Sequence, residues 1–279
     1  MRARAFRQVD VFTAVAYRGN PVAVVLDADD LDADVMLAFT RWTNLSEATF
    51  IQSPSVARAD YRLRIFTAGG ELPFAGHPTL GSAHAWLEAS GRPPHAGSTL
   101  VQECGAGLVD IRVDDGRLAF AAPPLRRSGP VSEDLAARIV RGLRVDPARV
   151  RGVQWVDNGP GWIGVLFDSA RSVLELQIDG NALRGLAVGV IGPHPHAGPA
   201  DFEVRAFFTG TDVFEDPVTG SLNAALAQWL IGAGLAPPRY RVRQGTALGR
   251  TGVVDITQEG DRVWVGGEAV TCIAGRVTL

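Results

Sequence analysis

Short segments in which hydrophobic and polar positions alternate recur along the chain and predict a protein rich in strands. Tyr61–Thr67 places apolar side chains and arginines at alternate positions, which is typical of a half-buried strand. Asp34–Thr43 has the wider spacing of an amphipathic helix, and we expect its buried face to include Trp42. Asp114-Asp115-Gly116 separates two further strand-like segments and predicts a hairpin turn.

The predicted elements occur in the same order in both halves of the chain. Segments of the second half resemble segments of the first in these pairs: Val165–Asp168 with Val24–Asp27, Val204–Thr209 with Leu63–Thr67, Val254–Ile256 with Val109–Ile111, and Arg262–Val265 with Arg117–Phe120. We therefore expect an α+β protein of two pseudo-symmetric lobes, each a barrel-like antiparallel or mixed sheet around a central helix. Residues 1–124 would form the first lobe and residues 125–279 the second, with C-terminal strands able to cross back to the first.

Each half also contains one predicted helix start of the same design. The segments Glu71–Ser82 and Phe214–Ser221 each precede an apolar, helix-forming stretch, and each contains a proline. Proline suits the first turn of a helix, because its φ is already set and no amide proton is needed there. This alignment matches His77 with Asp216 and predicts that both cap their helices. Since helix starts expose unpaired amides and the positive end of the dipole, the pair predicts a shared cleft for a small carboxylate.

Composition narrows the class of function. The 279 residues are 46% hydrophobic and 20% charged, which is ordinary for a folded globular protein. The net charge of −3 argues against a nucleic-acid partner, and the short apolar runs argue against a membrane span. We identify no signal peptide and the chain has 2 cysteines, so a cytoplasmic setting is expected. All 27 basic residues are arginine, which excludes chemistry that needs a lysine, such as Schiff-base formation.

A glutamate, a histidine and an aspartate are candidates for proton transfer. Glu47 directly precedes the apolar segment Ala48–Ile51. Such a residue is most often solvated, but partial burial would raise its pKa toward the range that a proton shuttle needs. Asp216 is also, more simply, a favoured N-cap residue, whereas His77 is a poor one, so its place in the repeat requires another reason. The repetition favours a functional cleft over capping alone.

Three patterns are weaker than they look. His77 and His84 would be two helical turns apart, about 10.5 Å, which is too far for one metal ion. His194-Pro195-His196 lies in a Gly/Pro-rich segment that we expect to be solvated, so no metal site is predicted. Gly159–Gly164 fits the dinucleotide pattern G-x-G-x-x-G, but a strand-like segment follows it where a helix would be needed, so we expect no nicotinamide cofactor.

A set of motifs runs nearly end to end along the chain. They are Gly19–Val25, Asn44–Phe50, Glu71–Thr79, Glu215–Ser221, and Gly249–Gly252 with Val265–Gly267. In this order and spacing they resemble the PhzF family of phenazine-biosynthesis isomerase-like proteins, which shares the two-lobed fold of diaminopimelate epimerase. The resemblance implies a cofactor-independent isomerase that transfers a proton within a small cyclic amino acid or related carboxylate, of which trans-2,3-dihydro-3-hydroxyanthranilate is the best-known example.

The resemblance also implies roles for individual residues. Glu47 would be the acid/base that removes a proton from one carbon and returns one elsewhere. His77 and Asp216 would orient the polar groups of the substrate and relay protons. The implied substrate-binding residues, whose backbone amides or side chains hold the substrate, are Asn20, Gly76, Gly220 and Ser221. The family is often dimeric, so a homodimer is expected, with neither metal nor cofactor.

Other functions stay open at this point. Glu103–Gly107 resembles the catalytic cysteine motif of diaminopimelate epimerase, which makes a two-base epimerase or racemase using Cys104 one alternative. The motif follows the predicted helix, however, and a buried structural cysteine is the usual case. A catalytically silent binding protein on the same fold is the other alternative. Two departures from the family pattern, at Ala68–Gly70 and Leu222-Asn223, would reshape the pocket and leave the natural substrate open.

Overall fold

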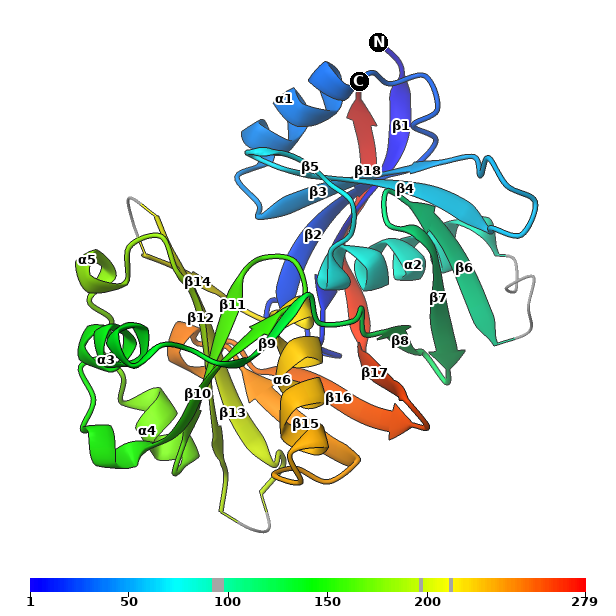
Figure 1. Ribbon diagram of the computed structural model, residues 1–279. Helices are drawn as coiled ribbons and strands as arrows, with labels where there is room; N and C mark the ends of the chain where they lie inside the picture. The colour runs from blue at the N-terminus through cyan, green and yellow to red at the C-terminus, as the bar shows by residue number, and fades with distance from the viewer. Residues whose placement is uncertain (92–97, 196–197, 211–212) are drawn as a thin grey trace. The chain divides into compact units, whose positions relative to one another are not determined.

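The computed structural model describes residues 1–91, 98–195, 198–210 and 213–279, and they form two compact units. The first unit contains Met1–Ala121 and Gly266–Leu279, and the second contains Ala122–Val265. Figure 1 shows the chain coloured from the N-terminus to the C-terminus. In the part of the chain that the structure describes, no helix is both long enough and apolar enough to cross a membrane.

The first unit is a mixed sheet with two helices. Its elements are β1 (Ala3–Val11), β2 (Asn20–Val25), α1 (Ala33–Thr43), β3 (Glu47–Gln52), β4 (Tyr61–Thr67), β5 (Gly70–Leu72), α2 (Gly76–Ser90), β6 (Thr99–Cys104), β7 (Gly107–Asp114), β8 (Arg117–Ala121) and β18 (Ala269–Thr278). The strands pair in the order β18-β1-β2-β3-β4-β6-β7-β8, with β5 on β4 as a short hairpin. The β2–β3 and β4–β6 pairs are parallel and the others antiparallel. Because β18 pairs with β1 along its length, the C-terminal segment belongs to this unit, and the two chain ends lie together (Figure 1).

The second unit has a sheet of the same kind with more helices. Its elements are β9 (Arg127–Pro130), α3 (Glu133–Gly142), the 3-10 helix η1 (Pro147–Arg149), β10 (Val150–Asp157), β11 (Trp162–Phe167), α4 (Ala170–Leu174), α5 (Gly180–Leu183), β12 (Ala187–Pro193), β13 (Phe202–Thr209), β14 (Val213–Asp216), α6 (Gly220–Gly232), β15 (Arg239–Gln244), the 3-10 helix η2 (Thr246–Leu248), β16 (Gly252–Glu259) and β17 (Arg262–Gly267), which ends in the first unit. Its strands pair in the order β9-β10-β11-β12-β13-β15-β16, with β14 on β13 as a hairpin.

The two units repeat one topology. In each unit the first two strands are antiparallel, and the third is parallel to the second. The fourth strand is antiparallel to the third and forms a short hairpin with the fifth. A helix follows, and the strand after it is parallel to the fourth. Thus β10 to β14 correspond to β1 to β5, α6 corresponds to α2, and β15 and β16 correspond to β6 and β7. The repeat predicted from the residue pattern is confirmed, as is the α+β class.

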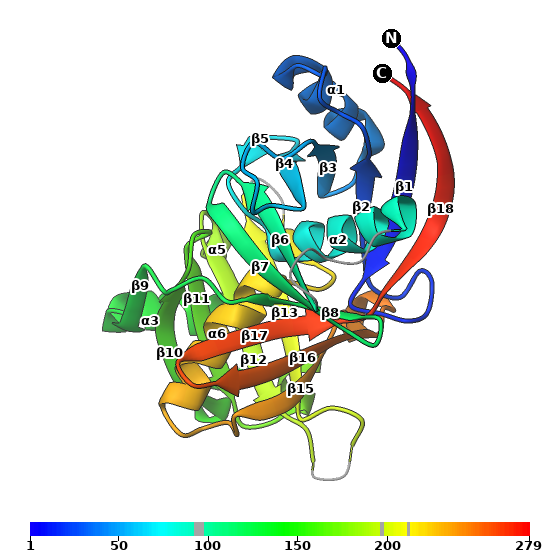
Figure 2. The same ribbon diagram turned by 90° about the vertical axis from the view of Figure 1, so that its right-hand side faces the viewer.

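Each sheet wraps around its central helix. α2 contacts β1 and β18 at one end of the strand order and β8 at the other, and Figure 2 shows it running across β1 and β2. α6 likewise contacts β10, β11 and β16. Both helices are buried over most of their length and rich in small apolar residues, as expected for helices surrounded by protein. These two barrel-like sheets around central helices match the predicted fold.

Glycines let sheet and helix approach closely. A Cβ added at Gly81 of α2 would overlap the Val22 side chain of β2. A Cβ added at Gly189 of β12 would overlap the Leu222 side chain of α6. Helix α6 also lies over Gly164 of β11, where an added Cβ would meet Leu226 and Trp229 at 3.0 Å. The same close packing therefore holds the central helix in each unit.

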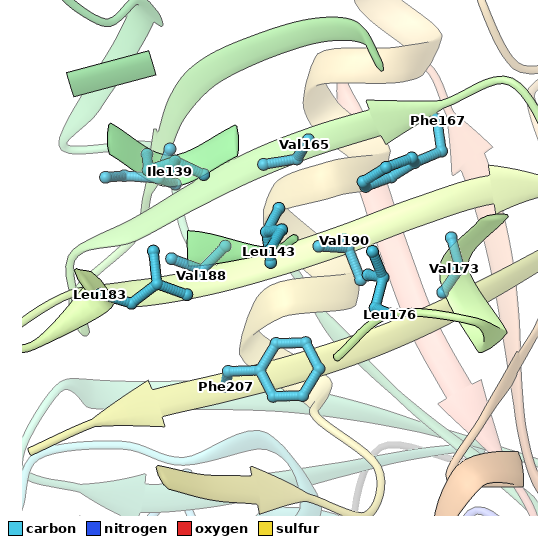
Figure 3. Close-up of a cluster of buried hydrophobic side chains, with 11 residues drawn as sticks. Ile139, Leu143, Val165, Phe167, Val173, Leu176, Leu183, Val188, Val190 and Phe207 are labelled. Atoms are coloured by element: carbon cyan, nitrogen blue, oxygen red, sulfur yellow. The ribbon is translucent and has the colours of Figure 1, made fainter. Parts of the chain in front are cut away.

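The other helices cover the outer face of each sheet. Successive residues of a strand point to opposite faces, so the residues next to Gly164 and Gly189 point away from α6. Helices α3, α4 and α5 pack there, and Figure 3 shows this cluster from the second unit: Ile139, Leu143, Val165, Phe167, Val173, Leu176, Leu183, Val188, Val190 and Phe207. In the first unit α1 buries Met36 and Phe39 in the matching place, against Phe50 of β3.

The predicted face of α1 is wrong, although the helix itself is confirmed. Trp42 was expected to be buried and is 76% exposed. The buried stripe is Met36, Phe39 and Thr40, at the helical spacing i, i+3, i+4. Because Thr40 is polar, the residue pattern did not count it as part of the core; its hydroxyl is satisfied by donating to the Met36 carbonyl at 2.8 Å.

Candidate active site

His77 lies inside the first turn of α2 and does not cap it. The helix begins at Gly76, and its N-cap residue is Ala75, which makes no capping hydrogen bond through its side chain. Pro78 follows as the third helical residue, where proline is tolerated because no intrahelical bond is lost. The prediction that His77 caps the helix is therefore wrong.

Asp216 also lies outside the helix that it was expected to cap. It is the last residue of β14 and is 8% exposed. Helix α6 begins at Gly220 after Thr219 as its N-cap residue, so Ser221 is the second helical residue. The two central helices thus begin with a glycine at the first position, but at different points of the motif that the residue alignment had matched.

Contacts with the sheet show which residues of the two helix starts correspond. The Asn20 side-chain nitrogen, from the first residue of β2, lies 3.4 Å from His77 Nδ1. The Trp162 indole nitrogen, from the first residue of β11, donates to Ser221 Oγ at 3.1 Å. Since β2 and β11 are equivalent strands, His77 corresponds to Ser221 in the fold, and the match of His77 with Asp216 is wrong.

The first unit brings three of the predicted residues together. Asn20 begins β2, Glu47 begins β3, and His77 projects from the first turn of α2 between them. The distance between His77 Nε2 and Glu47 Oε2 is 3.4 Å. The side chain of His77 is 6% exposed and that of Glu47 is 15% exposed. Glu47 is therefore mostly buried beside the imidazole, and the alternative of a solvated strand-end residue is wrong.

The imidazole of His77 is neutral. Burial lowers its pKa to about 3, because a charged ring would lose its hydration. The amide nitrogen of Asn20 is a hydrogen-bond donor, so Nδ1 acts as the acceptor and the ring proton sits on Nε2, the nitrogen near Glu47. If the ring were charged, Nδ1 would also carry a proton, and two hydrogen-bond donors, Nδ1–H and the Asn20 amide, would face each other. Glu47 Oε2 thus lies near the protonated nitrogen of a neutral imidazole, at 3.4 Å and without hydrogen-bond geometry, while Asn20 contacts the other ring nitrogen.

Asp216 is held by a polar network within the second unit. Thr219 Oγ1 donates to Asp216 Oδ2 at 2.7 Å, and Gln244 Nε2 donates to the Asp216 carbonyl oxygen at 3.1 Å. Asn223 of α6 joins them by donating to Gln244 Oε1 at 2.8 Å. All four residues are buried. The orientation of Asp216 is therefore fixed by buried hydrogen bonds.

The residue pattern missed Gln244, although a signal for it exists. Tyr240 and Val242 of β15 are buried, and the period of two along a strand places Gln244 on the same inward face. A glutamine at an inward position needs hydrogen-bond partners, since a buried amide without them is costly. That requirement points to a polar network around the start of α6. Trp162 offered no comparable signal.

Both helix starts supply groups that suit a carboxylate. The amides of the first turn have no acceptor within their own helix, and the dipole places partial positive charge there. In α2 these amides include those of Gly76 and His77, and in α6 those of Gly220 and Ser221. Carboxylates and phosphates bind readily at such positions.

The motifs judged to be weak have structural roles. His194 Nε2 lies 3.0 Å from Glu203 Oε2, and the Glu203 side chain is 1% exposed, so the expectation of a solvated segment is wrong for His194; His196 lies outside the described residues. Within the described ranges, no group of three or more His, Cys, Asp or Glu residues could hold a metal ion. In Gly159–Gly164, the Asp157 carboxylate accepts two glycine amides of the turn, and strand β11 follows, as predicted.

Cys104 lies away from Glu47 in the same sheet. Glu103 pairs with Arg62 of β4, whereas Glu47 pairs with Thr67. Because β4 and β6 are parallel, Cys104 is level with Leu63, four residues from Thr67, and four residues along a strand span roughly 13 Å, too far for two groups to act on one carbon. Burial raises the pKa of the Cys104 thiol, which favours the less reactive, protonated form. This geometry argues against a two-base mechanism that uses Cys104.

Comparisons with known proteins agree with this architecture over the whole chain. Antisense-enhancing sequence 1 of Schizosaccharomyces pombe is 36% identical, and the alignment covers 99% of each chain. Trans-2,3-dihydro-3-hydroxyanthranilate isomerase of Pseudomonas fluorescens is 31% identical, over 97% of this chain and 98% of its own.

Solved structures show the same fold. A phenazine biosynthesis protein of the PhzF family from Enterococcus faecalis is similar with a TM-score of 0.82 at 24% identity, over 100% of both chains. A hydroxyproline epimerase from Agrobacterium vitis is similar with a TM-score of 0.61 at 13% identity, over 99% of this chain and 91% of its own. The sequence profile of the phenazine biosynthesis-like proteins, PhzC-PhzF, matches residues 9–275. The chain therefore belongs to the PhzF family of phenazine biosynthesis-like proteins.

Proposed function

We propose that this protein is an isomerase that moves a proton within a small cyclic amino acid or related carboxylate. Trans-2,3-dihydro-3-hydroxyanthranilate is the first substrate to test, because relatives from Pseudomonas species carry the name of that isomerase. The observation that carries the proposal is the 3.4 Å contact between Glu47 and the neutral imidazole of His77. It places a mostly buried carboxyl group beside an uncharged imidazole, which suits a group that must both take and return a proton.

Glu47 acts as the acid/base in this mechanism. Its carboxylate takes a proton from one carbon of the substrate, and the electron pair of the broken C–H bond moves into the conjugated system. The proton then returns to a different carbon, and the double bond shifts accordingly. One proton leaves and one returns, so the reaction is redox-neutral. The Nε2 atom of His77 lies 3.4 Å from Glu47 Oε2, close enough to form a hydrogen bond after a small shift of either side chain, and Asn20 favours the tautomer that carries the proton on Nε2.

We place Asp216 and the two helix starts around the polar groups of the same substrate. Asp216 is a buried acid with a fixed orientation, which suits it to hold an amino or hydroxyl group. The amides of Gly76 and His77, or those of Gly220 and Ser221, would receive the substrate carboxylate. Support for each half comes from its own unit, and the joint site stays a proposal. The homodimer that the resemblance implies also stays a prediction.

Replacement of Glu47 by glutamine tests the assignment. Glu47→Gln keeps the shape of the side chain and removes its ability to exchange a proton, so turnover should fall by about 10²- to 10⁴-fold. The measurement is conversion of trans-2,3-dihydro-3-hydroxyanthranilate in D2O, followed by NMR for both product formation and deuterium at carbon. Glu133→Gln makes the same chemical change at an exposed position of α3 and should behave like the wild-type protein.

The outcomes separate the possible functions. A wild-type protein that converts the substrate while Glu47→Gln retains near-normal turnover refutes the role of Glu47. A wild-type protein that binds the substrate but incorporates no deuterium into it, or into a panel of cyclic amino acids, supports a silent binding protein. Unfolding curves for both variants show whether a loss of turnover comes from a loss of structure.

A further inference from the structure

Gln244 connects the acid of the second unit with the start of α6. It is the last residue of β15 and is fully buried. Its Oε1 accepts the Thr219 amide at 3.1 Å and the Asn223 side-chain amide at 2.8 Å. Its Nε2 donates to the Asp216 carbonyl at 3.1 Å and to Thr219 Oγ1 at 2.9 Å. Both ends of one buried amide are therefore used at the place where β14 passes into α6.

These contacts fix the direction of each hydrogen bond. Two donors face Gln244 Oε1, so the amide has a single satisfactory orientation, with Nε2 toward Thr219 Oγ1. Because Thr219 Oγ1 accepts that bond, its own proton is directed to Asp216 Oδ2, 2.7 Å away. The hydroxyl thus acts as a donor toward the acid. A bond of this kind to a carboxylate is both short and strong.

The first unit also contains a buried glutamine–threonine bond, at other positions of the repeat. Gln102 of β6, the strand equivalent to β15, is fully buried and donates from Nε2 to Thr79 Oγ1 at 3.1 Å. Its Oε1 accepts the Tyr61 hydroxyl at 3.1 Å. The two bonds occupy different places in the repeat, because Thr79 is the fourth residue of α2 and Thr219 is the N-cap residue of α6. In the second unit the threonine also donates to a carboxylate, that of Asp216.

We propose that Thr219 and Gln244 are positioning residues for Asp216 in catalysis, and that Thr219 holds Oδ2 so that Asp216 meets the substrate in one orientation. This inference rests on the proposed role of Asp216 in the isomerase reaction. The same bonds occupy the Thr219 amide, so α6 starts at Gly220 and its first-turn amides keep a fixed place. One buried glutamine therefore holds both Asp216 and the first turn of α6 in position.

The test compares Thr219→Val with Thr219→Ser. Valine has the shape of threonine without the hydroxyl, so kcat for trans-2,3-dihydro-3-hydroxyanthranilate should fall by about 10- to 100-fold, with a smaller change in KM. Serine keeps the donor and should restore kcat to near the wild-type value. Thr79→Val makes the same chemical change at the buried glutamine–threonine bond of the first unit and serves as the control. Its thermal stability should drop by a similar amount, with kcat close to wild type.

A double-mutant cycle with Asp216→Asn separates this inference from the function on which it rests. If Thr219 acts through Asp216, Thr219→Val should cause little further loss of kcat in the Asp216→Asn background. A loss in Thr219→Val that is fully additive with Asp216→Asn, or one that serine does not restore, overturns the positioning role. An Asp216→Asn variant with normal kcat refutes the role of Asp216 and with it the proposed function of this half. A normal Asp216 effect with an unaffected Thr219→Val variant refutes the positioning role alone.

Discussion

The charge state of His77 predicts a specific dependence of stability on pH. Folding lowers the pKa of His77 from its ordinary value of 6.5 to about 3, because the ring is buried. Between these values the unfolded chain binds a proton that the folded chain does not bind. The contribution of His77 to the free energy of unfolding is therefore fully present above about pH 6.5, and it is lost as the pH falls toward 3.

The size of the effect follows from the same shift. Each pH unit in this window corresponds to about 1.4 kcal/mol, so lowering the pH from 7 to 5 should reduce the contribution of His77 by about 2 kcal/mol. The variant His77→Gln cannot titrate and keeps an amide donor near the position of Nε2. Its stability should fall less than that of the wild-type protein over the same range. The groups that face His77 here are Asn20, which does not titrate, and Glu47.

The assay is urea unfolding of wild-type protein and His77→Gln at pH 7 and pH 5. The result is the change in the free energy of unfolding between the two pH values for the wild-type protein minus the same change for the variant. Because the chain has two units, the comparison should use the transition that reports the first unit, followed by Trp86 fluorescence in a chain stripped of its other tryptophans. A charged imidazole paired with Glu47 would give the opposite sign, since folding would then raise the pKa of His77. Wild-type protein that gains stability relative to His77→Gln on acidification would refute the neutral imidazole.

Two further predictions concern packing and the thiol. Gly189→Ala should destabilise the second unit by about 1–3 kcal/mol, because the added methyl group overlaps Leu222. Leu222→Ala alone should cost about 2–5 kcal/mol, but in that background the added methyl group should be neutral or stabilising. Urea unfolding of the four proteins measures these free energies, and simple additivity would contradict the packing described. Cys104→Ser should leave isomerase turnover unchanged, because Cys104 lies roughly 13 Å along the strand direction from Glu47. A loss of more than about tenfold in a folded variant would instead favour the epimerase alternative.

The residue pattern predicted the fold well because strand period and repeat order are local properties. In β4 the alternation of Leu63 and Ile65 with arginines matches alternate burial, with Arg62 exposed. The equivalent strand β13 is buried on both faces, and its hydrophobic run without alternation still marks a strand. Periodicity was thus enough to identify these strands, and two copies of one order were enough to predict two similar sheets.

The exact start of each central helix was beyond the pattern, because proline is compatible with several positions near a helix start. Pro78 is the third residue of α2, whereas Pro217 precedes the N-cap of α6. Matching the prolines therefore shifted the alignment of the two helices by several residues. The contact of Asn20 with His77 that corrects it joins residues far apart in the chain, and no local pattern contains such information.

The corrected alignment has a consequence for how a duplicated fold supports proton transfer. At the second helical position one unit has His77, held as a neutral donor, and the other has Ser221, held by Trp162. The acids also differ in place, since Glu47 begins the third strand of its repeat and Asp216 ends the hairpin strand of the other. An isomerase that uses one proton carrier needs a single group that exchanges protons and other groups that only hold the substrate. If both units contribute to one site, as proposed above, their different side chains at the same helix start would supply those separate roles, whereas two identical copies would supply the paired bases of an epimerase. The divergence between the units is thus a reason, independent of Cys104, to prefer the isomerase.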